Sequence, residues 1–392
     1  MDRKRQPVTP SALALIVLLA LPLIAARPAH AQTETVIFSF NASNGSYPQS
    51  SLIFDGAGNL YGTAEMGGEG DGDGNVFVLS PNGNGGWNQT VLYRFTGGAD
   101  GAFPSCNLIF DSAGNLYGTA QAGGSTRGVV FELSPAGATW KETVLYSFVG
   151  GTDGDTPVSG LIMDSAGNLY GTTLNGGTHN NGTVFELSPS GNSWTEQVIY
   201  NVDTSYAGLT LGAAGNIFGA SLNSVFELSP NGKGGWNPTV LHAFGTGGQK
   251  NSYGLQGTPV LDKSGNVYGT RYGGGGIGQV FKLSRGTKGK WKMQVLQSFQ
   301  NFTGPWAGIV FDAAGNIYGA TLHGGDYGYG TVFELVAPVG QGSYTENVLW
   351  SFTGTDGDYP SSLILDGAGN LYGTTREGGD QGGWGTVFEV TP

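Results

Sequence analysis

The chain has 392 residues, of which 72 are glycine, and its formal net charge is −12. Such acidity excludes a basic track for nucleic acid or for an anionic membrane. The single cysteine, Cys106, excludes an internal disulfide framework, so stability must come from packing in a chain long enough to bury a large core.

Residues 1–31 have the pattern of a secretory signal peptide. A basic start at residues 3–5 precedes an apolar run over residues 11–26 and a small-x-small cleavage site at residues 29–31. A retained membrane anchor is the alternative, but the run is short for a spanning helix. This segment holds four of the 17 basic and one of the 29 acidic residues, which leaves 13 and 28 after cleavage. We therefore expect a protein exported to the periplasm or the medium, with no membrane contact after cleavage.

The remaining residues, 32–392, repeat the segment Asp-x-Ala-Gly-Asn-Leu-Tyr-Gly-Thr, or a close variant. Its Asn recurs seven times, at Asn59, Asn115, Asn168, Asn216, Asn266, Asn316 and Asn370. The interval between neighbours ranges from 48 residues (Asn168 to Asn216) to 56 residues (Asn59 to Asn115). A nearly constant period of this size indicates a repeat architecture.

Each unit contains four short apolar runs with turn residues between them. In one unit these are residues 107–111, 116–120, 129–133 and 144–148. They are rich in Val, Leu, Ile, Tyr and Phe, as strands are, and no helical periodicity is long enough to link parallel strands. Seven units of four antiparallel strands predict an all-β, seven-bladed β-propeller over residues 32–392.

The two ends of this region predict how the ring closes. Val36–Phe40 matches the last strand of a unit, whereas the chain stops at Val387–Val390, which matches the third. The N-terminal strand is therefore expected to complete the seventh blade by pairing with the three C-terminal strands, which removes an open sheet edge. The Asp of each repeat is expected to bond backbone N–H groups in a tight turn. A metal-ligand role for these Asp and Asn residues is the alternative, although Gly212 replaces the Asp in blade 4.

The repeat resembles known families. Units that run Gly-Asn-Leu-Tyr-Gly-Thr, then Gly-Gly, then Gly-Thr-Val-Phe-Glu-Leu-Ser-Pro are similar to the GloVer-type tandem repeat of secreted bacterial proteins, over residues 34–392. This resemblance implies no established activity and no catalytic residue. The repeat also distantly resembles NHL-type propeller repeats. That second resemblance implies that the first strand of each unit is innermost, and that the loops between blades share a face with the loops joining strands two and three.

On that face, the residue just before the Gly-Gly pair varies while its surroundings stay constant. It is Met66, Ala122, Asn175, Tyr272, His323 or Glu377, with Asn223 nearest to it in blade 4. Variation on a constant frame suits an asymmetric ligand site, and a tolerant solvated loop is the alternative. Blades 5 to 7 hold the richest set of candidate ligand-binding residues, which is Arg271, Tyr272, Trp306, His323, Asp326, Tyr327, Tyr329, Arg376, Glu377, Asp380 and Trp384. Aromatic rings beside carboxylates and Arg are typical of carbohydrate-binding surfaces. Alternatively, these rings simply pack the loops together.

Indications of a metal site are weak. Asp71–Asn75 begins like a calcium loop, but Val76 and Asn82 stand where that loop needs Gly and a bidentate Glu. Asp-Gly-Asp segments at residues 153–155 and 356–358 either bind calcium loosely or form turns. The histidines lack the spacing of zinc ligands. We expect no cofactor beyond loosely bound calcium.

Catalytic motifs are equally sparse. There is no Gly-x-Ser-x-Gly motif, and Cys106 stands where other units place Ser or Ala, which predicts a packed, inert thiol. Asp326, Glu377 and Asp380 are the first carboxylates to consider for a hydrolase or lyase acting on polysaccharide. We predict a monomeric, non-enzymatic binding module whose partner is a carbohydrate or another extracellular protein. The alternatives are that enzyme and a structural cell-surface component.

Overall fold

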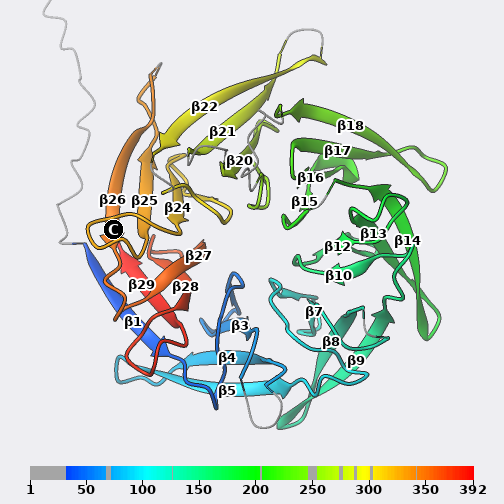
Figure 1. Ribbon diagram of the computed structural model, residues 1–392, viewed down its shortest axis with the longest axis horizontal. Helices are drawn as coiled ribbons and strands as arrows, with labels where there is room; N and C mark the ends of the chain where they lie inside the picture. Colours follow the sequence, from blue (N-terminus) through cyan, green and yellow to red (C-terminus); the bar gives the residue numbers. More distant parts are fainter. Residues whose placement is uncertain are drawn as a thin grey trace, which may run out of the picture. The chain divides into compact units, whose positions relative to one another are not determined.

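The computed structural model describes residues 32–67, 72–125, 127–203, 205–245, 254–272, 277–286, 289–300, 303–340 and 342–392. These residues form seven antiparallel sheets arranged in a ring, which is the predicted seven-bladed β-propeller (Figure 1). The predicted signal peptide, residues 1–31, lies outside the described residues. Within the ranges given above, no helix is long and apolar enough to cross a membrane.

The strands of each blade follow one another from the centre outwards. In blade 1 they are β2 (Ile53–Phe54), β3 (Leu60–Ala64), β4 (Asn75–Pro81) and β5 (Trp87–Arg94). In blade 2 they are β6 (Ile109–Phe110), β7 (Leu116–Ala120), β8 (Val129–Ala136) and β9 (Thr139–Ser147). In blade 3 they are β10 (Asp155–Pro157) and β11 (Ile162–Met163), which both pair with β12 (Leu169–Asn175), then β13 (Thr183–Ser190) and β14 (Ser193–Asn201).

Blades 4 to 7 repeat this order. Blade 4 contains β15 (Thr210–Leu211), the 3-10 turn η1 (Ala213–Gly215), β16 (Ile217–Ser221), β17 (Ser224–Pro230) and β18 (Trp236–Ala243). Blade 5 contains β19 (Val260–Leu261), β20 (Val267–Tyr272), β21 (Gly278–Arg285) and β22 (Trp291–Phe299). Blade 6 contains β23 (Val310–Phe311), β24 (Ile317–Thr321), β25 (Thr331–Val336) and β26 (Thr345–Ser351). Blade 7 contains β27 (Asp358–Leu365), β28 (Leu371–Glu377), β29 (Thr386–Thr391) and β1 (Thr33–Ser39).

The ring closes as predicted. Strand β1 pairs antiparallel with β29, in a register that runs from Thr33 opposite Thr391 to Ser39 opposite Thr386. The order within the sheet is β1-β29-β28-β27, so the first strand of the chain is the outermost strand of the last blade (Figure 1). The pairing joins the two ends of the propeller and covers the edge that β29 would otherwise expose.

The innermost strands differ from the prediction. In most blades they have two residues rather than five. In blades 1 to 3 a small side chain accepts the next N–H of the second strand in place of a ladder bond. The backbone N–H of Thr63 donates to Ser50 Oγ at 3.1 Å, and that of Thr119 donates to Cys106 Sγ at 3.0 Å. Cys106 is buried, as predicted, and burial raises the pKa of its thiol despite the hydrogen bonds from Thr119.

The Asp of each repeat organises a tight turn, which confirms the structural interpretation of this motif. Asp55 Oδ1 accepts the backbone N–H groups of Ala57 at 2.8 Å and Asn59 at 2.9 Å, and Oδ2 accepts the Tyr61 hydroxyl at 3.2 Å. Burial alone would raise the pKa of Asp55, but these hydrogen bonds outweigh it and hold the pKa below its ordinary value. Blade 4, which has Gly212 at this position, makes the turn with η1 instead.

The seams between blades repeat two contacts. The threonine of each Tyr-Gly-Thr segment donates its hydroxyl to a carbonyl of the next blade in most blades, as Thr63 Oγ1 does to Cys106 O at 3.2 Å. Thr374 Oγ1 donates to Ser50 O at 3.1 Å, which extends the same contact across the closure. Phenylalanine rings also meet edge to face at the seams, as in the pairs Phe95–Phe131, Phe148–Phe185 and Phe352–Phe388.

Three seams also bring two carboxyl groups together. Each pair joins a Glu of an outermost strand to an Asp of the preceding loop, and the pairs are Glu34 with Asp356, Glu142 with Asp100 and Glu196 with Asp153. In all three, Oε1 of the glutamate is buried and has no hydrogen-bond partner among the described residues. Burial first, and the charge of the Asp second, raise the pKa of Glu34 to about 8 and those of Glu142 and Glu196 to about 7.

These pairs predict that Glu142→Gln and Glu196→Gln stabilise the protein at pH 8. A folded-state pKa raised from 4.5 means that each group's stabilisation is complete below pH 4.5 and is lost as the pH rises to about 7. Removing the charge should raise the melting temperature at pH 8 by about 1–2 °C for each variant, after allowance for solvent screening, and change it little at pH 4.5. Thermal unfolding at the two pH values measures both effects.

Glu346→Gln is the matched control for this experiment. Glu346 occupies the same place in β26, but its Oε2 accepts a hydrogen bond from Gln297. We expect no stabilisation at pH 8 from Glu346→Gln. Equal melting temperatures for the wild type and Glu142→Gln at pH 8 would contradict the proposed carboxyl repulsion.

Candidate ligand pocket on the loop face

Two sets of loops meet at one face of the propeller. The loops that join blades pair with the ends of the second strands, as Ser46 does with Met66 and Ala102 with Ala122. This confirms that the loops between blades and the loops joining strands two and three share one face, as the NHL-like strand order implied. The loops are held by backbone bridges, so the side chains they carry have a fixed frame.

A cavity of about 630 Å³ lies on this face, where the innermost segments of the blades approach one another. All seven blades contribute to its lining, through residues such as Gln49, Asn107, Ser159, Tyr206, Thr258, Trp306 and Arg376. Every blade contributes residues around the start of its innermost strand, and five of the seven also contribute a residue from the end of the second strand: Glu65, Gln121, Leu174, Leu322 and Arg376. The closed ring is therefore a condition for the cavity to exist.

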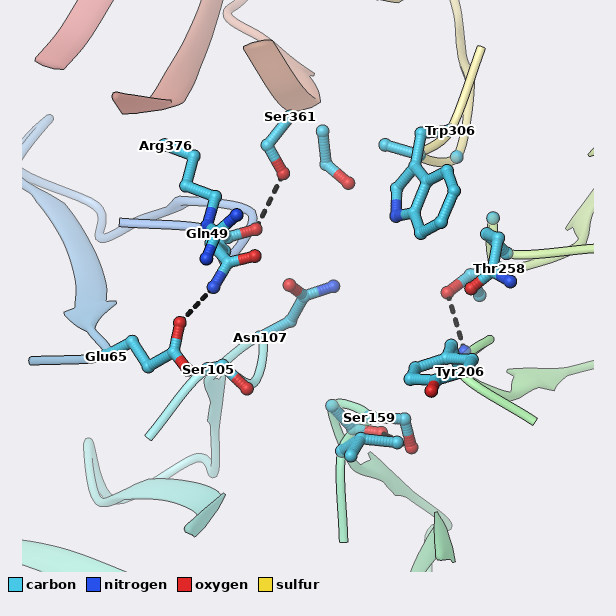
Figure 2. Close-up of a pocket in the computed structure, with 18 of the residues that line it drawn as sticks. Gln49, Glu65, Ser105, Asn107, Ser159, Tyr206, Thr258, Trp306, Ser361 and Arg376 are labelled. Atoms are coloured by element: carbon cyan, nitrogen blue, oxygen red, sulfur yellow. Dashed lines mark hydrogen bonds between the residues drawn. The ribbon is translucent and has the colours of Figure 1, made fainter. Parts of the chain in front are cut away.

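The cavity has two unlike walls. Figure 2 shows Gln49, Glu65 and Arg376 on one side, and the rings of Trp306 and Tyr206 on the other. The polar wall belongs to blades 7, 1 and 2, and the aromatic wall to blades 4 and 6. The sevenfold repeat of the backbone thus carries a strongly asymmetric set of side chains.

Hydrogen bonds hold the polar wall in place. Gln49 donates its side-chain amide to Glu65 Oε2, and the Ser361 hydroxyl donates to the backbone carbonyl of Gln49 at 2.6 Å. Asn107 Oδ1 accepts the backbone N–H of Ser51 at 2.7 Å, which orients the Asn107 amide toward the cavity (Figure 2). Burial raises the pKa of Glu65, although the charge of Arg376 and the hydrogen bond from Gln49 partly offset this.

Packing holds the aromatic wall. The Trp306 ring meets the ring of Tyr272 edge to face, with their centroids 6.0 Å apart. Between Trp306 and Tyr206 lies Thr258, whose Oγ1 accepts the backbone N–H of Gly208 at 3.1 Å (Figure 2). Tyr206 remains 48% exposed although it lines the cavity. Its ring offers a flat apolar surface to whatever enters.

Comparison with known families identifies the repeat. The Gloeobacter/Verrucomicrobia repeat matches residues 26–224, 107–281 and 254–392, which together span almost the whole chain. The chain belongs to the Gloeobacter/Verrucomicrobia repeat family. The resemblance to GloVer-type repeats is thereby confirmed.

Solved structures share the propeller fold with this member of the repeat family. One is the periplasmic gluconolactonase of Pseudomonas aeruginosa, with 15% identity, a TM-score of 0.54, and coverage of 81% of this chain and 87% of that chain. A second is a putative 6-phosphogluconolactonase from Bacteroides uniformis, with 14% identity, a TM-score of 0.53, and coverage of 82% and 96%. A third is PorZ, a surface component of the type-IX secretion system of Porphyromonas gingivalis, with 14% identity, a TM-score of 0.53, and coverage of 91% and 47%. A search of curated proteins found no match.

The structure places some of the residues predicted from the sequence at the cavity. Trp306 and Arg376 line it directly. Tyr272 is buried behind Trp306, and His323 lies edge to face with Tyr359, a lining residue, at 5.1 Å. Glu377 does not line the cavity, and its Oε1 lies 3.9 Å from Nη1 of Arg376, which does.

Others lie away from the cavity. Arg271 stacks over Phe244 at 5.0 Å, Trp384 packs on Tyr47 at 5.9 Å, and Asp326, Tyr327 and Tyr329 are exposed in the loop of blade 6. Asp380 lines a separate hollow beside strand β1. Within the described part of the chain, no hydrogen bond, ion pair or shared cavity joins Asp326, Glu377 and Asp380. Trp384 and Tyr272 therefore pack against neighbouring rings, as the alternative interpretation of these aromatic residues expected. The polar side chains that line the cavity are mostly ones that were not predicted.

Sequence reasoning missed Glu65 and Gln121 by one position. Both come just before the variable residue that precedes Gly-Gly, and neighbouring residues of a strand point to opposite sides. In blade 5, one residue fewer separates the Tyr-Gly-Thr segment from the Gly-Gly pair. Tyr272 therefore donates its backbone N–H to the carbonyl of Gly254, as Gln121 does to the carbonyl of Phe103. Tyr272 thus occupies the place of Glu65 rather than that of Met66. The residue type also varies between repeats one position before the Met66 position, and this variation could have indicated Glu65 and Gln121.

The proposed calcium loops contain turn and ion-pair contacts. Asp153 accepts the Tyr146 hydroxyl at 2.8 Å and the Val149 N–H at 2.7 Å, and Asp155 pairs with Arg127 at 2.6 Å. Asp71 of the loop at residues 71–75 lies outside the described residues. In the ranges that the structure describes, no three His, Cys, Asp or Glu residues lie close enough together to hold a metal ion.

Proposed function

We propose that this protein binds a carbohydrate in the central cavity without turning it over. The observation that carries the proposal is the pairing of an aromatic wall, Trp306 and Tyr206, with a facing wall of amide, carboxylate and hydroxyl groups. A sugar ring has apolar faces that stack on aromatic rings and hydroxyls that bond to polar side chains. The cavity volume of about 630 Å³ falls in the range of small-molecule sites.

The number of carboxyl groups that line the cavity favours binding over glycoside hydrolysis. Glu65 is the one carboxylate among the described residues that line it. Glycosidases ordinarily place two carboxyl groups on either side of the bond that breaks. The fold shared with gluconolactonases supports no particular reaction here, because it comes with only 14–15% identity.

The setting of this function follows from the predicted leader. We propose that the protein is exported, acts as a monomer in the periplasm or the medium, and needs no cofactor beyond loosely bound calcium. A protein partner on the same loop face is the alternative ligand. Calorimetry with and without calcium addresses the ion, and light scattering addresses the monomer.

We expect Trp306→Ala and Tyr206→Ala each to weaken carbohydrate binding about tenfold or more, which is about 1.4 kcal/mol. Each substitution removes a flat surface on which the sugar stacks. A glycan array with the purified protein identifies a ligand, and calorimetry measures the affinity of each variant for it.

Tyr327→Ala is the contrasting variant. Its ring is 62% exposed and lies in the blade 6 loop rather than in the cavity lining. A larger loss for Tyr327→Ala than for Trp306→Ala would place the ligand on the rim instead. If the wild type consumes the bound sugar, the protein is an enzyme and the proposal of binding without turnover is wrong.

A further inference from the structure

We propose that the cavity selects uncharged sugars and rejects sugars that carry a carboxylate, and that Glu65 is the residue that decides this. The inference rests on the proposed function of the cavity, and it adds the chemical class of the ligand. It starts from the contacts of Glu65 on the polar wall.

Glu65 is fixed and faces the cavity. It follows β3 directly, its backbone N–H donates to the Tyr47 carbonyl at 3.3 Å, and its Oε2 accepts the amide of Gln49. Figure 2 shows the carboxylate beside Gln49 and Ser105, on the side opposite the aromatic rings. An ionised carboxylate only accepts hydrogen bonds, so it suits ligands that offer hydroxyl donors.

A ligand carboxylate at this wall would meet a like charge. Two negative groups a few ångströms apart repel each other, and the repulsion grows where water is partly excluded. Neutral sugars avoid this repulsion, because every hydroxyl can donate to Glu65. Glu65 therefore favours one class of sugar and disfavours the other.

Arg376 opposes this selection only in part. Its guanidinium lies 5.4 Å over the ring of Tyr47 and 3.9 Å from Glu377 Oε1, and its charge also acts on Glu65. Arg376 thus shares its charge between Glu65, which lines the cavity, and Glu377, which does not, so it neutralises Glu65 only in part. The other titratable groups that share the cavity with Glu65 are Tyr206 and Tyr359.

The selection should depend on pH in a defined direction. Burial raises the pKa of Glu65 above the ordinary 4.5, so its charge is lost at a higher pH than that of a solvated glutamate. A protonated Glu65 no longer repels a ligand carboxylate, whereas Arg376 keeps its positive charge. Discrimination against acidic sugars is therefore strongest at pH 8 and falls as the pH approaches 4.5.

The experiment compares matched oligosaccharides, oligoglucose with oligoglucuronate and oligogalactose with oligogalacturonate. Calorimetry at pH 8 and pH 5 gives the affinity ratio of the neutral to the acidic member of each pair. We expect the wild type to bind the neutral member of at least one pair about tenfold more tightly at pH 8, equivalent to about 1.4 kcal/mol, with a smaller ratio at pH 5. Glu65→Gln should reduce the ratio at pH 8 to near one and abolish its pH dependence.

Glu132→Gln is the matched control, because Glu132 bonds to Ser134 in the third strand of blade 2 and does not line the cavity. It should keep the wild-type ratio. Arg376→Gln is a second variant, which should widen the ratio because it removes the positive charge. If Glu65→Gln does not fold, as judged by circular dichroism and melting, the Arg376→Gln result decides: a wider ratio supports the inference and an unchanged or narrower ratio overturns it.

The two proposals fail in different ways. If no member of either pair and no glycan on the array binds, the proposed function is wrong. If the wild type binds acidic members as tightly as neutral ones, or Glu65→Gln keeps the wild-type ratio, this inference is wrong while the carbohydrate site stands.

Discussion

Phe40→Ala should reduce the free energy of unfolding by about 3–5 kcal/mol, the usual range for deleting a fully buried Phe side chain. Phe40 is 1% exposed, follows the closing strand β1, and donates its N–H to Gly385 O at 2.9 Å. Its ring meets Phe38 at 5.0 Å and Phe77 of blade 1 at 5.1 Å. The substitution therefore leaves a cavity at the seam where the last blade meets the first.

Urea unfolding followed by tryptophan fluorescence measures this loss. Val149→Ala is the control, since Val149 is 66% exposed in a loop between blades and its truncation should change stability by less than about 0.5 kcal/mol. A loss below about 1 kcal/mol for Phe40→Ala would mean that the N-terminal strand does not pack into the seam.

Gly373→Ala should destabilise the protein by about 1–3 kcal/mol, the range for overpacking a filled core. A Cβ at Gly373 would lie 2.6 Å from Phe388 Cζ and 2.9 Å from Leu363 Cδ2. The Phe388 ring cannot move aside easily, because it is fully buried and packs on Phe352 with centroids 5.0 Å apart. The same close approach of a Phe ring recurs at the equivalent Gly of all seven repeats, which are Gly62, Gly118, Gly171, Gly219, Gly269, Gly319 and Gly373.

Gly367→Ala, in the same blade, is the matched control. A Cβ at Gly367 meets nothing within 4 Å, its φ is not positive, and four of the other repeats have Ser or Ala at this place. We expect no loss, or a slight gain from the reduced entropy of the unfolded chain. Equal melting temperatures for the two variants would show that the seam tolerates an extra methyl group and that the Phe packing is loose.

The repeat made the fold predictable because each blade uses the same local contacts. Asp55 and its equivalents close the same turn with hydrogen bonds to residues two to six positions away, so the pattern carries its own structural meaning. The closing strand was predictable for a related reason. The propeller region begins with a fourth strand and ends with a third strand. Each of these strands has an edge without a partner unless the two pair with each other.

The cavity was only partly predictable. Trp306 and Arg376 were predicted because aromatic and charged residues in loops are typical of ligand sites. Gln49, Asn107 and Tyr206 belong to no local motif that would indicate a site. Glu65 was missed because a shift of one residue along a strand changes the side to which a side chain points. Tyr272 was placed one position too late, because the positions were aligned on the Gly-Gly pair and blade 5 has one residue fewer between its Tyr-Gly-Thr segment and that pair.

From the sequence alone came the number of blades, the closure and the structural role of the repeated Asp, because these depend on contacts within one unit or between adjacent units. The resemblance to NHL-type repeats implied the strand order. The opposing walls of the cavity came from the folded ring. Glu65 and Trp306 are 241 positions apart in the numbering, and they share one cavity only because the ring brings blades 1 and 6 around a common axis. Long-range convergence of this kind leaves no periodic trace in the chain.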